Sequence, residues 1–123
     1  MKIENIKFKA KSTLDGAWVI GDLIHKEDGK IYILRNGFNV SEIDPSTVCQ
    51  FTGLKDKDGK DIFENDILYD KDSGIASAIK WKRHVCGYVY EKAGMFATVH
   101  VYASHTSLLK IIGNKFNRKE SKK

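Results

Sequence analysis

The sequence has little of several features that mark common protein classes. Its 123 residues include one proline and no segment rich in proline, glycine and serine, and no internal repeat is recognisable. No apolar run approaches the ~20 residues that cross a bilayer, and the first few residues lack the apolar core of a signal peptide. We therefore expect one soluble domain over residues 1–116, in a cytoplasm, followed by a basic, disordered tail over residues 117–123.

Cysteine is also scarce. Cys49 and Cys86 stand far apart, and neither belongs to a Cys-x-x-Cys pair. Two isolated thiols in a chain without a secretion signal are more typical of small buried side chains than of a disulfide. His84 and Cys86 would share a face of a strand, but no second Cys or His stands at a short, motif-like spacing. We therefore expect neither a zinc site nor a catalytic cysteine.

Motifs for catalysis and for cofactors are missing as well. The sequence has no glycine-rich phosphate loop, no serine nucleophile elbow and no Walker pattern. We therefore expect a protein that is not an enzyme and that holds no cofactor.

The net charge of +5 is unevenly placed. From Lys115 onward the chain has five basic residues and one acidic residue, so this segment contributes +4 and all the preceding residues together +1. The basic character therefore belongs to the tail. Such a tail can serve either nucleic-acid binding or solubility.

The sequence does contain a series of short β-prone segments that are separated by glycine turns. In the first of these segments, three lysines alternate with apolar residues, which predicts a half-buried strand with its lysines in water. Asx-Gly pairs such as Asp28-Gly29 suit tight hairpin turns, because Gly and Asn adopt positive φ at low cost. The segments are 6–11, 18–24, 31–34, 47–52, 67–69, 75–81, 85–90 and 95–103, and the short element 108–112 is left unassigned. This spacing predicts a mostly β fold, a small barrel or sandwich, with one short helical piece near 44–46 or 104–109.

The acid-rich segment Asp56–Asp66 first suggests a calcium loop. If Gly59 takes the sixth position of an EF-hand loop, Leu54 falls on the first ligand position and Asn65 on the twelfth, where a bidentate carboxylate is needed. No helical pattern flanks the loop. We therefore interpret residues 57–60 as a hairpin turn.

Glu64 and Asp66 lie just before an apolar strand, and alternation would place both side chains on one face. Paired carboxylates can bind a divalent metal or share acid–base work. No third ligand lies nearby in the sequence, so a solvent face or a cap on backbone N–H groups is the favoured interpretation.

The run Lys80-Trp81-Lys82-Arg83-His84 mixes an aromatic residue with cations, as proteins that bind single-stranded nucleic acid do. Trp81 follows Ile79 at a spacing of two, however. Core packing for the ring and a wet edge for the cations is therefore favoured.

Residues 48–67 resemble the central stretch of the YopX family of phage and prophage proteins. That stretch reads Gln-Phe-Thr-Gly-Leu-x-Asp-x-x-Gly, followed by an aromatic–Glu–Gly–Asp–apolar turn into a strand. Asn65 stands where the family commonly has Gly, and Asn also tolerates a left-handed backbone, so we expect the turn to survive. Weaker similarities are Trp18 with Gly21, Pro45, Ile79 with Trp81, and Ile112-Gly113-Asn114.

The resemblance implies a compact β fold with an SH3-like barrel part, an origin in a mobile element, and no established activity. It also implies structural roles within the motif. Gly53 and Gly59 would set turns, Phe51 and Phe63 would pack, and Gln50, Thr52, Glu64 and Asp66 would hold neighbouring backbone. The chain ends in basic residues where the family commonly continues into a helix, which leaves a C-terminal helix open.

Our leading hypothesis is a non-enzymatic accessory protein of a phage or prophage. It would act in the bacterial cytoplasm by binding a macromolecule, with a host or phage protein ahead of nucleic acid, no membrane partner, and a homo-oligomer left open. The predicted binding surface comprises Glu64, Asp66, Trp81, Lys80, Lys82 and Arg83. The alternatives are a nucleic-acid-binding protein that uses the tail and Lys80–His84, and a metal-dependent hydrolase that uses Glu64 and Asp66.

Overall fold

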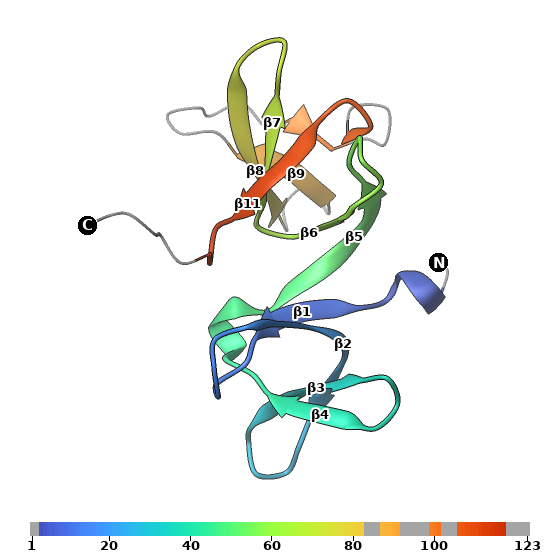
Figure 1. Ribbon diagram of the computed structural model, residues 1–123, viewed down its shortest axis with the longest axis vertical. Helices are drawn as coiled ribbons and strands as arrows, with labels where there is room; N and C mark the ends of the chain where they lie inside the picture. The colour runs from blue at the N-terminus through green and yellow to red at the C-terminus, as the bar shows by residue number, and fades with distance from the viewer. Residues whose placement is uncertain (1–2, 83–86, 92–98, 102–105, 118–123) are drawn as a thin grey trace, which may run out of the picture. The chain divides into compact units, whose positions relative to one another are not determined.

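The computed structural model describes residues 3–82, 87–91, 99–101 and 106–117. The chain divides into two compact units, unit 1 (Met1–Gly53) and unit 2 (Leu54–Lys123), which are blue to green and green to red in Figure 1. The sequence predicted a single domain over residues 1–116, which stays a prediction, and the two compact units divide at Gly53 within that range. Residues 118–123, most of the predicted tail, lie outside the described residues.

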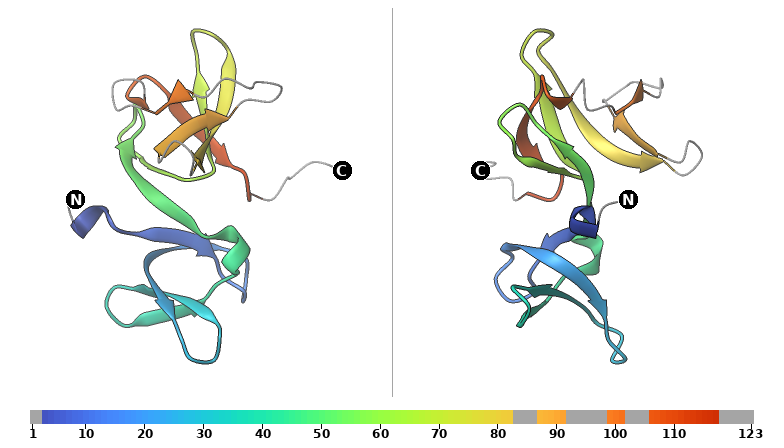
Figure 2. Two further views of the ribbon diagram at one scale, coloured as in Figure 1. Left: turned by 180° about the vertical axis from the view of Figure 1, so that it is seen from behind. Right: turned by 90° about the vertical axis from the view of Figure 1, so that its right-hand side faces the viewer.

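Unit 1 is an antiparallel meander whose closing strand returns beside the first strand. Its elements are η1 (Ile3–Asn5), β1 (Phe8–Lys11), β2 (Trp18–His25), β3 (Ile31–Arg35), β4 (Asn39–Glu42), the 3-10 helix η2 (Pro45–Thr47) and β5 (Cys49–Lys55). The strand order is β4-β3-β2-β1-β5, and β6 of unit 2 follows β5. Figure 2 shows the long β2 strand curving through this unit.

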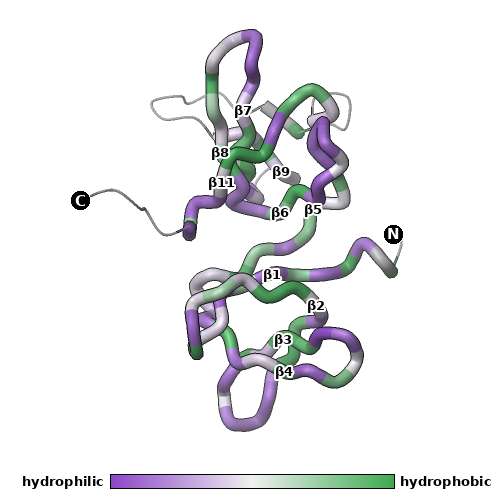
Figure 3. Tube along the Cα trace, in the orientation of Figure 1, coloured by the Kyte–Doolittle hydropathy of each residue, from purple (hydrophilic) through white to green (hydrophobic). Residues whose placement is uncertain are grey.

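The core of unit 1 follows from the alternation along its strands. Ala10 and Val19 pair in register across β1 and β2, and both point into the core with Ile33 and Ile43. Gly21 is required in β2, because a Cβ there would overlap the Leu34 carbonyl oxygen. Figure 3 shows green, hydrophobic stretches along the strands of this unit and purple, hydrophilic turns between them.

Unit 2 repeats the same path with different residues. Its strands are β6 (Asp61–Phe63), β7 (Asp66–Asp70), β8 (Ile75–Lys82), β9 (Gly87–Glu91), β10 (Val99–His100) and β11 (Lys110–Asn114). The strand order is β10-β9-β8-β7-β11, so β11 closes beside β7 as β5 closes beside β1. Ile62, Leu68 and Ile79 form its core. This repeat of topology has no counterpart in the sequence, where no repeat is recognisable.

The mostly β prediction is confirmed, since strands account for more than half of the described residues. The barrel needs correction, because the described residues form two antiparallel sheets and no closed barrel. In unit 1, the ends of β1 and β4 meet only at one bridge, between Ser12 and Ile43. The ladder stops there because the chain turns after Ser12 and enters η2 after Asp44.

Helix is minor, as predicted. Asp44 caps η2 by accepting a hydrogen bond from the Ser46 N–H at 3.0 Å, and Pro45 takes the first helical position. The other predicted helical segment, near 104–109, falls partly outside the described residues. No helix in the described part of the chain is long and apolar enough to cross a membrane.

Candidate binding site

The acid-rich loop is a hairpin turn that is held by a buried carboxylate. Asp56 is 4% exposed. Its Oδ1 accepts hydrogen bonds from the N–H groups of Asp58 (2.8 Å) and Lys60 (2.9 Å). Its Oδ2 accepts one from the Ile111 N–H at 3.1 Å, which ties the turn to β11. The turn prediction is therefore confirmed, and both carboxylate oxygens of Asp56 accept hydrogen bonds from backbone N–H groups.

The same contacts set the acidity of Asp56. Burial raises the pKa of its carboxyl group, but the three backbone N–H groups outweigh that effect, and the pKa lies below its ordinary value. The charged form of Asp56 therefore stabilises unit 2.

A second buried carboxylate holds the start of β7. Asp66 is 1% exposed. Its Oδ2 accepts a hydrogen bond from the Phe63 N–H at 2.8 Å, and its Oδ1 accepts one from Asn114 Nδ2 at 2.8 Å. Asp66 lies inside unit 2 and not on a surface, which matches the interpretation of a cap on backbone N–H groups.

Between them, Asn65 makes the left-handed turn that the sequence required. Its φ is 73°, and its backbone N–H donates to the Ile79 carbonyl oxygen at 2.7 Å. Its side-chain Oδ1 accepts a hydrogen bond from Lys80 Nζ at 3.1 Å. Asn65 thus preserves the turn in place of Gly and fastens it to β8.

The remaining motif residues are two buried aromatic side chains, two glycines with positive φ and two polar residues of β5. Phe51 and Phe63 are buried, and Gly53 and Gly59 have φ of 86° and 81°. Gln50 is exposed in β5, and Thr52 is half-buried. Within the described residues, no group of three or more His, Cys, Asp or Glu side chains could hold a metal ion.

Trp81, one of the residues of the predicted binding surface, is exposed. Its side chain is 48% exposed, and its ring packs edge to face against Tyr88 of β9, with 5.2 Å between ring centroids. Trp81 and Tyr88 are directly opposite in register. Tyr88 was missed in the sequence, although its alternation with Tyr90 in the strand that follows Trp81 was the available signal.

The cations of the same segment lie on the other face of β8. Alternation places Lys80 and Lys82 opposite to Trp81, where they pair in register with Val89 and Gly87. Arg83 and His84 lie outside the described residues. The described cations and the exposed ring therefore do not share one surface.

Glu64 precedes Asn65, whose backbone N–H bonds the carbonyl oxygen of Ile79, two residues before Trp81, and the charge of Glu64 acts on Tyr88. Glu64 is half-buried in the turn that Asn65 fastens to β8. Burial and then the charge of Glu64 raise the pKa of Tyr88 to about 12. Burial alone raises the pKa of Tyr90 to about 12, and its hydroxyl finds no hydrogen-bond partner in the part of the chain that the structure describes. We call Glu64, Trp81 and Tyr88 the Trp81 cluster.

Unit 1 has its own aromatic–cation arrangement, which differs from the predicted strand with lysines in water. Lys9 Nζ lies 4.8 Å from the centroid of the Trp18 ring and Lys11 Nζ lies 5.6 Å from it. Lys7 Nζ lies 4.6 Å from the Phe51 ring centroid. These lysines cover aromatic faces and remain half-buried.

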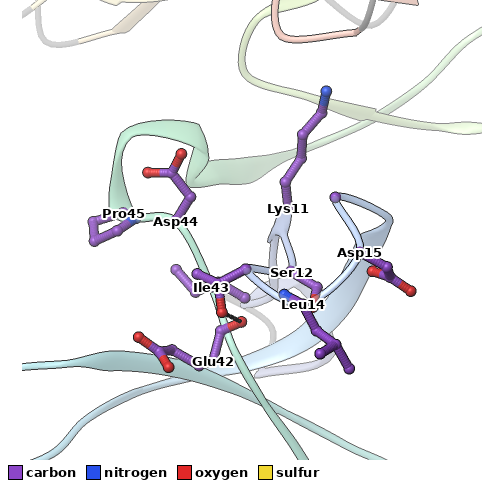
Figure 4. A pocket seen from close by; sticks show the side chains of 10 residues that line it. Lys11, Ser12, Leu14, Asp15, Glu42, Ile43, Asp44 and Pro45 are labelled. Atoms are coloured by element: carbon purple, nitrogen blue, oxygen red, sulfur yellow. Dashed lines mark hydrogen bonds between the residues drawn. The ribbon is translucent and has the colours of Figure 1, made fainter.

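A shallow, open pocket of about 630 Å³ lies in unit 1 between the β1–β2 turn and the approach to η2. Figure 4 shows that the carboxylates of Asp15, Glu42 and Asp44 point in different directions around it. Asp15 and Asp44 accept backbone hydrogen bonds of their own turns. The polar groups therefore do not converge on one ligand position.

The fold and these contacts define a small antiparallel β protein whose most specific segment is a structural turn beside an exposed tryptophan. A family model described as YopX protein matches residues 2–120, so the chain belongs to the YopX family. No curated protein matches the chain.

Proposed function

We propose that this protein is a non-enzymatic accessory protein of a phage or prophage, and that it binds a macromolecule in the cytoplasm of a bacterial host. Membership of the YopX family supports the mobile-element origin. A protein partner is favoured over nucleic acid, because Tyr88, which packs against the exposed Trp81 ring, is acted on by the charge of Glu64, whereas the described lysines of β8 lie on the other face.

The exposure of Trp81 carries this proposal. Tryptophan is large and apolar, and leaving half of its surface in water is costly. Exposed aromatic side chains held by packing on one edge are typical anchors of protein interfaces. Tyr88 fixes the Trp81 ring, so little side-chain entropy is lost when a partner covers it.

Quantitative co-purification from a bacterial host lysate tests the proposal. We expect a stoichiometric partner that is retained by the wild type and lost with Trp81→Ala. Tyr69→Ala is the matched control, because Tyr69 is an exposed aromatic residue on the opposite face of the same sheet. If the wild type, Trp81→Ala and Tyr69→Ala recover every partner equally, the Trp81 surface is not the binding site.

Nucleic-acid binding is the second candidate, and the distribution of charge favours it. Residues 1–53 contain seven basic and seven acidic residues, whereas residues 54–123 contain fourteen and nine, so unit 2 carries all of the net charge of +5. Binding to DNA and RNA across a salt series tests this function. We expect a steep loss of affinity with salt that becomes shallower when residues 118–123 are deleted. Unchanged affinity after the deletion would exclude a role for residues 118–123 in nucleic-acid binding.

We also propose that each unit is related to an SH3-like barrel. The support is the shared path, in which a four-stranded meander is followed by a strand that returns beside the first, and the 3-10 helix before β5. Nuclear Overhauser contacts in solution test this for unit 1: backbone contacts of β1 with both β2 and β5 are expected, and their absence would refute the relation.

A further inference from the structure

Three polar groups of the Trp81 cluster have no hydrogen-bond or ion-pair partner among the described residues. The Trp81 indole N–H, the Tyr88 hydroxyl and the Glu64 carboxylate make no hydrogen bond or ion pair with any residue that the structure describes. Elsewhere in unit 2 the carboxylates of Asp56 and Asp66 use both of their oxygens. The cluster therefore differs from the structural carboxylates around it.

No cation among the described residues forms an ion pair with the Glu64 carboxylate. Lys80 donates to Asn65 Oδ1, and Lys82 lies on the face of β8 away from Trp81. A carboxylate near an aromatic pair can bind a cation in two ways, through an ion pair and through the faces of the rings. The same carboxylate repels phosphate, so the cluster is unsuited to a nucleic-acid backbone.

We propose that the Trp81 cluster is a receptor for an arginine side chain that a partner protein presents. The inference rests on the proposed binding function and names the chemistry of its partner. A planar guanidinium can stack on the Trp81 ring while it donates to Glu64, whereas the compact ammonium of lysine cannot do both equally well. Tyr88 holds the ring in place from its edge.

Direct titration of the whole chain with a labelled peptide of alternating glycine and arginine tests the receptor. The protein carries Trp18→Phe, so that Trp81 is its only tryptophan and its emission reports on the site. Anisotropy of the peptide gives the affinity. The comparison peptides replace arginine by lysine or by citrulline, which is planar and neutral, and an oligothymidine strand probes nucleic acid.

We expect the arginine peptide to change Trp81 emission and the citrulline peptide to leave it unchanged. Glu64→Gln should weaken arginine-peptide binding about tenfold, and Tyr69→Ala should leave it unchanged. Glu64→Lys should abolish it and give measurable binding to a peptide of alternating glycine and aspartate. That exchange of preference would not follow from a folding defect.

Several results would overturn the receptor. One is equal binding of the arginine and citrulline peptides, and another is arginine binding that Glu64→Gln leaves unchanged. Trp81-dependent binding of oligothymidine alone would assign the surface to nucleic acid. If the arginine peptide leaves Trp81 emission unchanged while Trp81→Ala still removes a co-purified partner, the arginine receptor fails and the proposed binding function stands.

Discussion

Unit 1 and unit 2 have the same strand topology but are stabilised by different contacts. Unit 1 relies on an apolar core, a backbone contact at Gly21 and lysines laid over aromatic rings. Unit 2 adds two buried carboxylates that bind backbone N–H groups, and both lie in the family's most specific stretch. The difference teaches that some residues of one sequence motif can stabilise the fold, as Asp56 and Asp66 do, while a neighbour such as Glu64 is the residue proposed for binding.

Each unit contains one tryptophan, Trp18 or Trp81, so the stability of each can be followed separately. Variants with Trp18→Phe report on unit 2, and variants with Trp81→Phe report on unit 1. Each experiment below uses denaturant unfolding with the reporter of the unit concerned.

The largest effect is expected from Asp66→Ala. The change leaves the Phe63 N–H and the Asn114 amide buried without their acceptor, which costs about 3 kcal/mol of the free energy of unfolding of unit 2. Asp66→Asn keeps an oxygen acceptor and should cost less. If Asp66→Ala leaves the Trp81-reported midpoint unchanged, the buried carboxylate does not fasten unit 2.

A second comparison uses two glycines that lie within strands. Gly21→Ala should destabilise unit 1 by about 2 kcal/mol, because the new Cβ meets the Leu34 carbonyl oxygen. Gly113→Ala in unit 2 is the matched control, since its nearest neighbour, Asn117 Nδ2, is 3.6 Å away. Equal losses at the two sites would show that the close approach in β2 is unimportant.

Acid should weaken unit 2 through Asp56. Because its folded-state pKa is lowered, its contribution is fully present above the unfolded-state value of ~3.9 and is lost as the pH falls through the folded-state pKa. Asp56→Asn should therefore reduce the loss of stability of unit 2 between about pH 5 and about pH 2. Asp58→Asn, exposed in the same turn, is the control, and an acid response that is the same in all three proteins would contradict the assignment.

The smallest effect is expected at the surface ion pair of unit 2. Lys55 Nζ lies 2.6 Å from Asp61 Oδ1, but the two side chains are 61% and 25% exposed. Lys55→Ala should change the free energy of unfolding by about 0.5 kcal/mol or less. A loss comparable to that of Asp66→Ala would mean that exposed and buried carboxylates fasten unit 2 equally.

The sequence predicted the strands with clear apolar alternation and the turns with Asx-Gly pairs. It missed β4 (Asn39–Glu42) and β6 (Asp61–Phe63), because β4 is polar and β6 is only three residues long. The repeat of topology was invisible because equivalent positions need only similar polarity, not identical residues.

The candidate site was harder to predict than the fold. Alternation placed Glu64 and Asp66 together, but the left-handed turn at Asn65 separates them, so that Asp66 is buried and Glu64 lies near Tyr88. Trp81 and the lysines of β8 likewise lie on different faces of the sheet, because the side chains of neighbouring residues along a strand point to opposite faces. Partners distant in sequence, such as Asn114 for Asp66, need the folded chain to be seen.

The strand β5 runs across the boundary at Gly53, and this has a consequence for synthesis on the ribosome. Once residues up to Lys55 have left the exit tunnel, β1 to β5 are complete and β5 can pair with β1. Unit 2 must wait for Asn114, since β11 supplies the partner strand of β7. A chain that is released after β8 and before β11 has been made would have a finished first unit and an open, aggregation-prone edge on β7.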